Sequence, residues 1–242
     1  MCFKSDTWMK FLNYYKMKFD NENIKLKTGH NKTAVLIEPR EDDLIELVVK
    51  NFMYFLHKDW NLMIICGNKN KDYILNLSKT IGNVIIANLE MDNLNGNQYN
   101  ALCLSKELYN LIPTENMLFF QIDTLLRKPI TDDYLIYAYV GAPWRKDLQW
   151  FNETNGIGNG GLSLRRKSYM LSIIEKYNNE NNICIGNEDI IIGKMCKQMD
   201  LPMPTYEDAC SFSIEMVMNN DPIGIHKPHF NEDQIKHLLT VA

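Results

Sequence analysis

The residues best suited to chemistry begin with Gln121 and Asp123, at the end of the apolar run 117–123. If the run is a strand, residues two apart share a face, so we expect both side chains to converge on one site. Ligands of open α/β sheets bind at the carboxyl edge of the strands. Mg²⁺ and Mn²⁺ prefer oxygen ligands and are commonly held by one or two carboxylates plus substrate phosphates, so Asp123 is a candidate metal ligand. The structural alternative is an aspartate that caps the turn toward Lys128.

A second candidate segment is glycine-rich and covers residues 155–166. Its glycines let the backbone approach a ligand closely. It lacks the Gly-Lys-Ser/Thr of a phosphate-binding loop and does not follow a first strand, so it gives little support to dinucleotide binding. The structural alternative is a tight turn with an incidental asparagine.

Adjacent carboxylates, Glu188 and Asp189, begin an apolar helical stretch. Acids at this position also cap a helix and stabilise its N-terminus, which is the structural alternative. The functional interpretation is a general base that takes a proton from an acceptor hydroxyl.

The last candidate pair is His226 and Lys227, close to the C-terminal end of the sequence. A neutral imidazole can ligate Mn²⁺, and a lysine beside it can neutralise phosphate oxygens. The structural alternative is that the pair lies on the surface and contacts only solvent, which is the more common case for such a pair alone.

Alternating strands and helices must position these residues. Short apolar runs predict buried strands, and apolar residues at helical spacing predict the helices between them. The predicted strands are 34–37, 62–66, 84–87, 117–123, 134–144 and 160–164, and the predicted helices are 42–57, 71–81, 99–111, 167–178 and 189–199. Residues 200–242 are interpreted as a proline-punctuated tail. The pattern predicts an α/β fold whose sheet is parallel at its start.

Residues 1–30 are lysine-rich with aromatic residues at roughly helical spacing. They are interpreted as an N-terminal extension, either an amphipathic helix laid on the domain or a partly ordered segment. Residues 31–242 are predicted to form one domain.

Composition excludes several classes of protein. The 242 residues with 45% hydrophobic content suffice for one large domain with a full core. With 26 Lys and Arg against 30 Asp and Glu, the net charge of −4 argues against a dedicated nucleic-acid binder. The six cysteines form no CxxC pair, so spacing predicts no zinc knuckle or redox motif. We find no secretory signal and no apolar stretch of about 20 residues, and therefore expect no membrane span and a cytoplasmic location.

In this order and at these distances, the four segments resemble a GT-A nucleotide-sugar glycosyltransferase from about Thr33 to Phe230. The chain is similar in particular to a small microbial and viral family of uncharacterised glycosyltransferase-like proteins. The motifs that carry the resemblance are Glu38-Pro39-Arg40, Trp60, Phe120 to Thr124, Gly141 to Trp144, Gly158 to Arg165, Glu188-Asp189 and Pro222 to Lys227. The resemblance implies a single GT-A type, Rossmann-like domain with a mixed central sheet flanked by helices.

The resemblance also implies a metal site and a donor site. Asp123 would be the surviving acid of the DxD motif and would bind Mn²⁺ or Mg²⁺ with His226, while Gln121 stands at the place of the usual first Asp. Lys227 would face the diphosphate. The residues assigned to the nucleotide-sugar donor are Glu38, Arg40, Gly67, Asn68, Gln121 and Lys227.

For the acceptor, the resemblance implies a wall made of Trp144, Asn159, Gly160 and Gly161. Asp189 matches the base of inverting members, with Glu188 as its neighbour or substitute. In a retaining enzyme Asp189 would instead orient the acceptor.

The function so implied is transfer of a sugar from a nucleotide diphosphate donor, a UDP-sugar being favoured, to a hydroxyl of a glycan or protein acceptor. One alternative is a catalytically silent protein of GT-A fold that binds carbohydrate or acts as a scaffold. The other is a metal-dependent nucleotidyltransferase, which would normally show a glycine-rich loop after the first strand, where this chain has the acidic segment 38–42.

Overall fold

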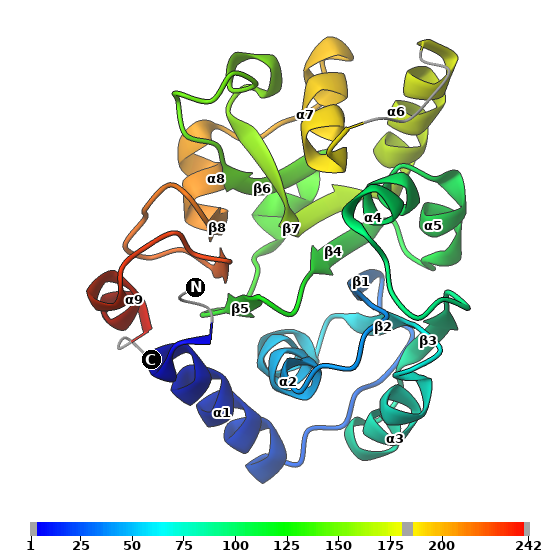
Figure 1. Cartoon of the computed structure of the whole chain (residues 1–242), viewed down its shortest axis with the longest axis vertical. Coiled ribbons are helices and arrows are strands. Elements are labelled where there is room, and N and C mark those ends of the chain that lie inside the picture. The colour runs from blue at the N-terminus through cyan, green and yellow to red at the C-terminus, as the bar shows by residue number, and fades with distance from the viewer. Residues whose placement is uncertain (1–3, 181–185, 240–242) are drawn as a thin grey trace.

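A mixed sheet forms the centre of the molecule. The computed structural model describes residues 4–180 and 186–239, and in this part of the chain six strands pair in the order β3-β2-β1-β4-β7-β6 (Figure 1). The strands β1, β2, β3 and β4 are mutually parallel, whereas β7 runs antiparallel to both of its neighbours. Their bounds are β1 Lys32–Glu38, β2 Asn61–Cys66, β3 Ile85–Asn88, β4 Asn116–Phe120, β6 Tyr139–Pro143 and β7 Ile157–Arg166. The α/β class with a mixed central sheet is therefore confirmed.

Both faces of the sheet are covered. Ala34 and Leu36 of β1 belong to one apolar cluster, whereas Val35 and Ile37 belong to another on the opposite face. This alternation is what a continuous apolar run gives when helices bury both faces of a strand. The short run at the start of β1 is thus a doubly buried strand, as predicted.

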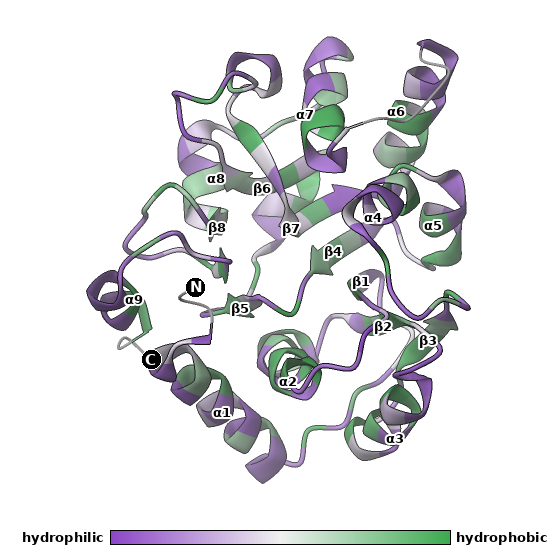
Figure 2. Ribbon diagram, in the orientation of Figure 1, coloured by the Kyte–Doolittle hydropathy of each residue, from purple (hydrophilic) through white to green (hydrophobic). Residues whose placement is uncertain are grey.

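Each apolar cluster contains its own set of helices. The cluster with Leu36 includes residues from α1 (Asp6–Asn21), α2 (Leu44–Leu56), α3 (Lys71–Ile81) and α9 (Glu232–Leu239). The cluster with Val35 includes residues from α4 (Gly96–Cys103), α5 (Lys106–Leu111), α6 (Lys167–Glu180) and α7 (Glu188–Gln198). Figure 2 shows α2 as hydrophobic along most of its length, consistent with its place between α1 and the sheet. No helix within residues 4–180 and 186–239 is long and apolar enough to cross a bilayer.

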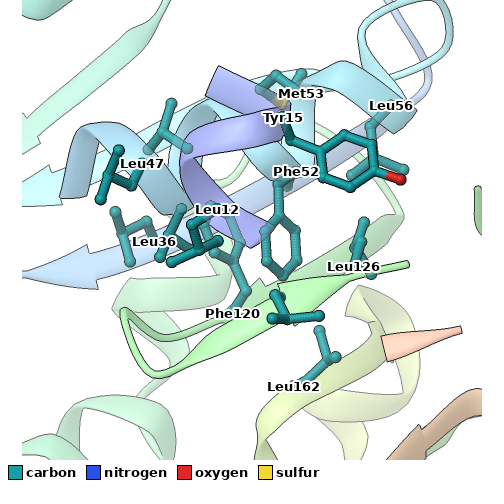
Figure 3. Packing of buried hydrophobic residues seen from close by; sticks show 14 of the residues in the cluster. Leu12, Tyr15, Leu36, Leu47, Phe52, Met53, Leu56, Phe120, Leu126 and Leu162 are labelled. Atoms are coloured by element: carbon teal, nitrogen blue, oxygen red, sulfur yellow. The ribbon is translucent and has the colours of Figure 1, made fainter. Parts of the chain in front are cut away.

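An aromatic stack anchors the carboxyl end of β4. Phe52 of α2 and Phe120, the last residue of β4, have ring centroids 4.1 Å apart and an interplanar angle of 15°. Leu12 and Tyr15 of α1 lie in the same cluster (Figure 3). The end of β4 is therefore fixed by packing immediately before Gln121.

The N-terminal helix shares this core. The buried residues of α1 are Trp8, Phe11, Leu12, Tyr15 and Phe19, and the Ser5 side chain caps the helix by accepting from the Trp8 N–H. The helix also meets the other end of the described chain, because the Thr7 hydroxyl donates to Glu232 of α9 at 2.6 Å. The domain boundary at residue 30 stays a prediction.

Two predicted elements are divided differently in the structure. The predicted helix 99–111 is two helices, α4 and α5, because the Ser105 side chain accepts from the Leu108 N–H and caps a new helix. The predicted strand 134–144 begins instead as a 3-10 turn, Asp132–Ile136, and only β6 is extended. Acids in the first turn and an exposed Ile136 account for the difference, since a buried strand has room for neither.

The predicted tail is an ordered part of the fold. It contains α8 (Tyr206–Phe212), β8 (Ser213–Ile214), β9 (Gly224–His226) and α9. A second, three-stranded sheet forms from β5 (Thr124–Leu126), β9 and β8, in the order β5-β9-β8. These strands are too short for the apolar pattern to be distinguished from loop sequence, but they bring residue 226 beside residue 124.

Candidate active site

A pocket of about 510 Å³ opens at the carboxyl edge of the parallel strands β1 and β4. Its walls come from the ends of these two strands, from the segment that leads into α4, from the residue before α7 and from the residue after β9. The lining residues are 37–40, 93–96, 99, 100, 121–123, Asn187 and Lys227. The pocket lies where ligands bind in open α/β sheets.

Gln121 and Asp123 reach this pocket from a turn, not from a strand. Strand β4 ends at Phe120, and the Thr124 N–H and hydroxyl both donate to the Gln121 carbonyl, at 3.2 and 2.5 Å. The strand geometry predicted for residues 121–123 is therefore wrong. The convergence of both residues on one site holds, because the turn also directs them to the pocket.

Asp123 is ionised in a buried setting. Burial by itself raises the pKa of its carboxyl, but the nearby His226 and the charge of Lys227 outweigh burial and lower the pKa below its usual value. The Oδ1 atom is buried without a hydrogen-bond partner. A negative oxygen is thus available for a cation or a polar ligand.

His226 faces Asp123 because the two short strands β5 and β9 pair with Thr124 opposite His226. The imidazole Nε2 lies 3.5 Å from Asp123 Oδ1, and Nδ1 lies 3.7 Å from Glu215 Oε1. Burial lowers the pKa of His226, but the two carboxylates outweigh burial and raise it. Both ring nitrogens are buried and have no hydrogen-bond partner.

Lys227 occupies a strained backbone conformation. Its φ is +35°, in the left-handed region that non-glycine residues rarely adopt. The Lys227 N–H donates to the Asp123 carbonyl at 2.9 Å, which ties residue 227 to the turn after β4. Strain of this kind is found where the surrounding structure fixes a functional residue. Lys227 lines the pocket beside Asp123.

Glu215 belongs to this cluster, although the sequence interpretation missed it. It follows β8 and is buried, and the Asn159 side-chain amide donates to its Oε2. Burial raises the pKa of the Glu215 carboxyl, and the charges of His226 and His229 oppose that rise. The one signal in the sequence is a carboxylate inside the apolar stretch 212–217.

Glycines 160 and 161 make room for functional side chains on opposite faces of β7. A Cβ at Gly160 would lie 2.4 Å from Glu188 Oε1, and one at Gly161 would lie 2.2 Å from His226 Nε2. Asn159 is buried and bonded to Glu215, while its Oδ1 accepts from the Gly161 N–H at 3.1 Å. In the structure these three residues support the site from behind and do not line the pocket, which differs from the predicted acceptor wall.

Trp144 is also placed differently from the prediction. Its side chain is 4% exposed and packs edge-to-face on Trp150, with ring centroids 5.7 Å apart. The indole presents no face on which a sugar could stack.

Glu188 and Asp189 have separate roles at the start of α7. Glu188 is buried and pairs with the fully buried Arg165 at 3.3 Å, and Arg165 also donates to the hydroxyls of Ser163 and Tyr109 at 3.0 and 3.1 Å. A charge held in this way stabilises the local structure and is not free to accept a proton from a substrate. Glu188 therefore does not substitute for Asp189 as a base.

Asp189 does not line the pocket, and backbone N–H groups hold its carboxylate. Its carboxylate accepts from the N–H groups of Gly160 at 3.2 Å and Ile190 at 2.8 Å. Burial and the neighbouring Glu188 charge raise its pKa to about 7. A carboxyl that ionises near neutral pH is matched to proton transfer at that pH.

Glu38 and Arg40 both line the pocket and pair with each other. The Arg40 Nε and Nη2 donate to the two Glu38 oxygens at 2.8 and 2.7 Å, and this hydrogen bonding raises the pKa of Arg40. Glu38 is buried, whereas the Arg40 side chain remains partly exposed. The pair therefore presents a positive group to the pocket, and Glu38 orients it.

Gly67 and Asn68 do not line the pocket. A Cβ at Gly67 would lie 2.5 Å from the Pro39 carbonyl oxygen, so glycine is required for the close approach of the loops after β1 and β2. Asn70, which the sequence interpretation missed, joins these loops by accepting from the Gly67 N–H and donating to the Glu38 and Arg40 carbonyls. Asn68 accepts from the Asn88 side chain at 3.1 Å. The donor assignment of Gly67 and Asn68 stays a prediction.

The Asp123 and His226 pair fits a divalent cation. An unpartnered carboxylate oxygen and an unpartnered imidazole nitrogen face each other, both buried, and both are metal-ligand types. Within residues 4–180 and 186–239, no group of three or more His, Cys, Asp or Glu side chains is placed to hold a metal ion. Two protein donors suffice for Mg²⁺ or Mn²⁺ only when phosphate and water oxygens complete the shell.

The described thiols are not part of the site. Cys66, Cys103 and Cys196 are buried and free, and burial raises the pKa of Cys103 and Cys196 to about 12. Thiols with such values are not nucleophiles at neutral pH. Cys2 and Cys184 lie outside the described residues.

The fold is that of glycosyltransferases. The apo form of the glycosyltransferase GlyE from Streptococcus pneumoniae TIGR4 matches with a TM-score of 0.50 and 12% identity over 84% of this chain. A second GlyE structure gives a TM-score of 0.49 at 12% identity, over 83% of this chain and 56% of its own. The mannosyltransferase PcManGT from Pyrobaculum calidifontis, in complex with GDP-Man and Mn²⁺, gives 0.48 at 11% identity, over 84% of this chain and 64% of its own.

At these identities the similarity concerns the fold alone. The chain spans 56% of the length of GlyE. No curated protein matches the sequence.

The sequence itself identifies a family. Residues 84–226 match the model described as "Protein of unknown function (DUF5672)", which covers more than half of the chain. The chain therefore belongs to the DUF5672 family. The matched range includes Asp123, Asp189 and His226.

Proposed function

We propose that the protein is a glycosyltransferase that uses a nucleotide-sugar donor. The observation that carries the proposal is that Asp123 and Lys227 line one pocket and that the buried His226 lies 3.5 Å from Asp123, although residues 123 and 226 come from distant parts of the sequence. Asp189, with its pKa of about 7, lies two residues from Asn187 of the same pocket. The glycosyltransferase fold agrees with this chemistry but does not by itself establish it.

The donor is proposed to be a nucleoside diphosphate sugar, with UDP-sugars tested first. Arg40 and Lys227 both line the pocket and give it two positive groups, of which Arg40 is paired with Glu38. A diphosphate gains negative charge on its oxygens as the sugar leaves, and fixed cations stabilise that charge. The acceptor is proposed to be a hydroxyl of a glycan or of a protein.

A divalent cation, Mn²⁺ or Mg²⁺, is proposed to bind between Asp123 and His226. When bound it would neutralise charge on the departing diphosphate. This chain's own part is to hold the two donors in a buried position with no competing hydrogen bond at Asp123 Oδ1.

Asp189 is proposed to accept the proton of the attacking hydroxyl. The hydrogen bonds from Gly160 and Ile190 fix the carboxylate, and the partly buried setting keeps its basicity high. Arg165 and Glu188 hold the start of α7 and so position Asp189 without taking the proton themselves.

The test is release of sugar from UDP-, GDP- and CMP-sugars, with and without Mn²⁺. We expect cation-dependent release from one nucleotide class, lost in Asp123→Ala. The matched control is Asp72→Ala, because Asp72 is an exposed aspartate of α3 outside the pocket. Equal release by the Asp123→Ala variant contradicts the proposed site.

A catalytically silent, carbohydrate-binding protein is the second candidate. It is favoured by the two-donor metal site, which has fewer carboxylates than a complete DxD motif supplies. Glycan binding by a folded protein that releases sugar from none of the donors would establish this candidate in place of the transferase.

A further inference from the structure

Asn51 is a fully buried polar residue in the middle of the apolar helix α2. Asparagine is a poorer helix former than leucine, and its amide loses its hydrogen bonds to water on burial. Such a residue is stable in a core only when other groups of the protein satisfy its amide. The partners of Asn51 therefore indicate its role.

The partner of Asn51 is the backbone of Leu126 in β5. The Leu126 N–H donates to Asn51 Oδ1 at 2.8 Å, and the Asn51 amide donates to the Leu126 carbonyl at 3.0 Å. A neighbouring strand would satisfy the same two groups, but β5 is an edge strand of the three-stranded sheet, paired with β9 on its other side. Leu126 is fully buried, so loss of Asn51 would leave two backbone groups without this partner and away from solvent.

The residue after Asn51 fixes the strand on the other side of the same turn. The Phe52 ring stacks on Phe120, the last residue of β4, with centroids 4.1 Å apart. Residues 121–123 form the turn between Phe120 and β5. Two consecutive residues of α2 therefore hold the two strands that flank the turn.

This turn carries Asp123 and contacts the segment that carries His226. Thr124 of β5 pairs with His226 of β9, and the Lys227 N–H donates to the Asp123 carbonyl at 2.9 Å. Because packing fixes the end of β4, a shift of β5 would have to be absorbed within residues 121–123. The 3.5 Å separation of Asp123 Oδ1 and His226 Nε2 thus depends on where β5 is held.

We propose that Asn51 is a positioning residue that fixes β5 on α2 and so holds Asp123 and His226 facing each other. The inference rests on the proposed function for the cation that these two residues would share, but the contacts through which Asn51 acts belong to this chain alone. Asn51 does not line the pocket and acts through the backbone of β5.

Amide hydrogen exchange of metal-free protein tests the positioning directly. The Leu126 N–H reports the bond to Asn51, and the Lys227 N–H reports the bond between the turn and the residue after β9. Asn51→Leu has a similar shape but no polar group. We expect exchange at both amides to be about 10- to 100-fold faster in this variant, because two buried hydrogen bonds are lost.

Cation affinity is the second readout, measured by titration of Mn²⁺ in the presence of UDP. Loss of the groups that support metal ligands weakens metal affinity by about 10- to 100-fold, and we expect a loss of this size in Asn51→Leu. Asn51→Gln carries the same amide on a longer arm. It should fall between wild type and Asn51→Leu in both readouts.

Asn61→Leu is the matched control. Asn61 is also buried and also satisfies the backbone of a distant segment, since it accepts from the His30 N–H at 3.2 Å and donates to the His30 carbonyl at 2.9 Å. It begins β2 opposite Thr33, at the amino end of the parallel strands and away from the pocket. Urea unfolding should show a comparable loss of stability, whereas exchange at Lys227 and the Mn²⁺ affinity should keep their wild-type values.

The outcomes separate this inference from the proposed function. Unchanged exchange at Lys227 in Asn51→Leu, an Mn²⁺ affinity equal to that of wild type, or equal changes in Asn61→Leu overturns the inference, even if sugar transfer is observed. Faster exchange at Lys227 in Asn51→Leu alone, in a protein that transfers no sugar, supports the inference and contradicts the transferase. If Asn51→Leu does not fold, the same comparisons on Asn51→Gln decide.

Discussion

At the scale of single residues, the raised pKa of Asp189 predicts how the stability of the protein depends on pH. Its pKa of about 7 in the folded protein exceeds the usual value near 4, so between these pH values the folded state binds a proton that the unfolded state has lost. Stability contributed by the protonated form is full below about pH 4 and is lost as pH rises toward 7. We predict that Asp189→Asn is more stable than wild type at pH 8, by at most about 4 kcal/mol, and equally stable at pH 4.

Urea unfolding of both proteins at the two pH values checks this. A stability difference that is the same at pH 4 and pH 8 contradicts the raised pKa. Gly160 N–H donates to Oδ2 and Ile190 N–H to Oδ1, so the single amide oxygen of the variant can accept from only one of them. That loss does not depend on pH, so the change between the two pH values isolates the charge.

The same substitution should slow catalysis. General base action contributes about 10²- to 10⁴-fold, so we expect Asp189→Asn to lose that factor in the rate of sugar transfer while it still binds the donor nucleotide. The rate of wild-type protein should rise with pH through about 7, and this dependence on Asp189 should vanish in the variant. Transfer at the wild-type rate would remove Asp189 from the reaction.

Two substitutions at Lys227 can separate the effect of backbone strain from the effect of the side-chain charge. The left-handed φ of +35° costs an alanine more than a glycine, so Lys227→Gly should be more stable than Lys227→Ala by about 1 kcal/mol. Both variants lack the ammonium and should bind UDP equally weakly. Thermal unfolding and calorimetric titration give the two quantities, and a stronger UDP affinity for one variant would mean that backbone shape, not charge, sets binding.

At the scale of elements, β7 supports the site, because site residues pack against its glycines. A Cβ at Gly161 would lie 2.2 Å from His226 Nε2, so Gly161→Ala must displace the imidazole. We predict that the variant loses Mn²⁺ binding and is destabilised by about 1 to 3 kcal/mol.

A double-mutant cycle locates the cause of this loss. In a His226→Ala background the ring is gone, and Gly161→Ala should then cost much less stability. The measurement is the free energy of unfolding of the four proteins. Additive costs would show that the clash arises elsewhere on β7.

At the scale of the whole molecule, the packing of α1 bears on whether residues 1–30 are separate from the domain 31–242. Trp8 is fully buried in the cluster that contains α2 and β1, so Trp8→Ala should cost about 3 to 5 kcal/mol. Removal of residues 1–30 should expose the apolar surface of α2 and give a protein that aggregates. Exposed Met17→Ala on the same helix is the control for the point variant. A soluble, cooperatively unfolding 31–242 fragment would instead support the predicted domain boundary.

The inner strands β1, β2 and β4 could be predicted from the sequence because their residues are almost all buried. The apolar run in β1 has one interpretation. The helix predicted over 99–111 contains Ser105, and the hydrogen bond by which Ser105 caps a new helix cannot be predicted from the spacing of apolar residues. The strands β8 and β9 have only 2 and 3 residues and are defined by their pairing partners, which no local pattern encodes.

The same limit applies to the site. Five predicted residues do line the pocket, namely Glu38, Arg40, Gln121, Asp123 and Lys227. Each lies in one of the short motifs that carry the resemblance. Glu215 is the one carboxylate in an apolar segment, so no local motif marks it as a site residue. It joins the site only because β9 places His226 beside it. Trp144 was assigned by residue type, and only packing against Trp150 shows that its ring is covered.

The pairing of β5 with β9 has a consequence for the order in which the site forms during synthesis. The strands of the central sheet have all been synthesised once β7 is made, but His226 and Lys227 come later in the chain, at and after β9. A nascent chain that ends before β9 has all the strands of the large sheet and only one of the two proposed cation donors. Translation order therefore keeps the proposed reaction centre incomplete until β9 has been synthesised and has paired with β5.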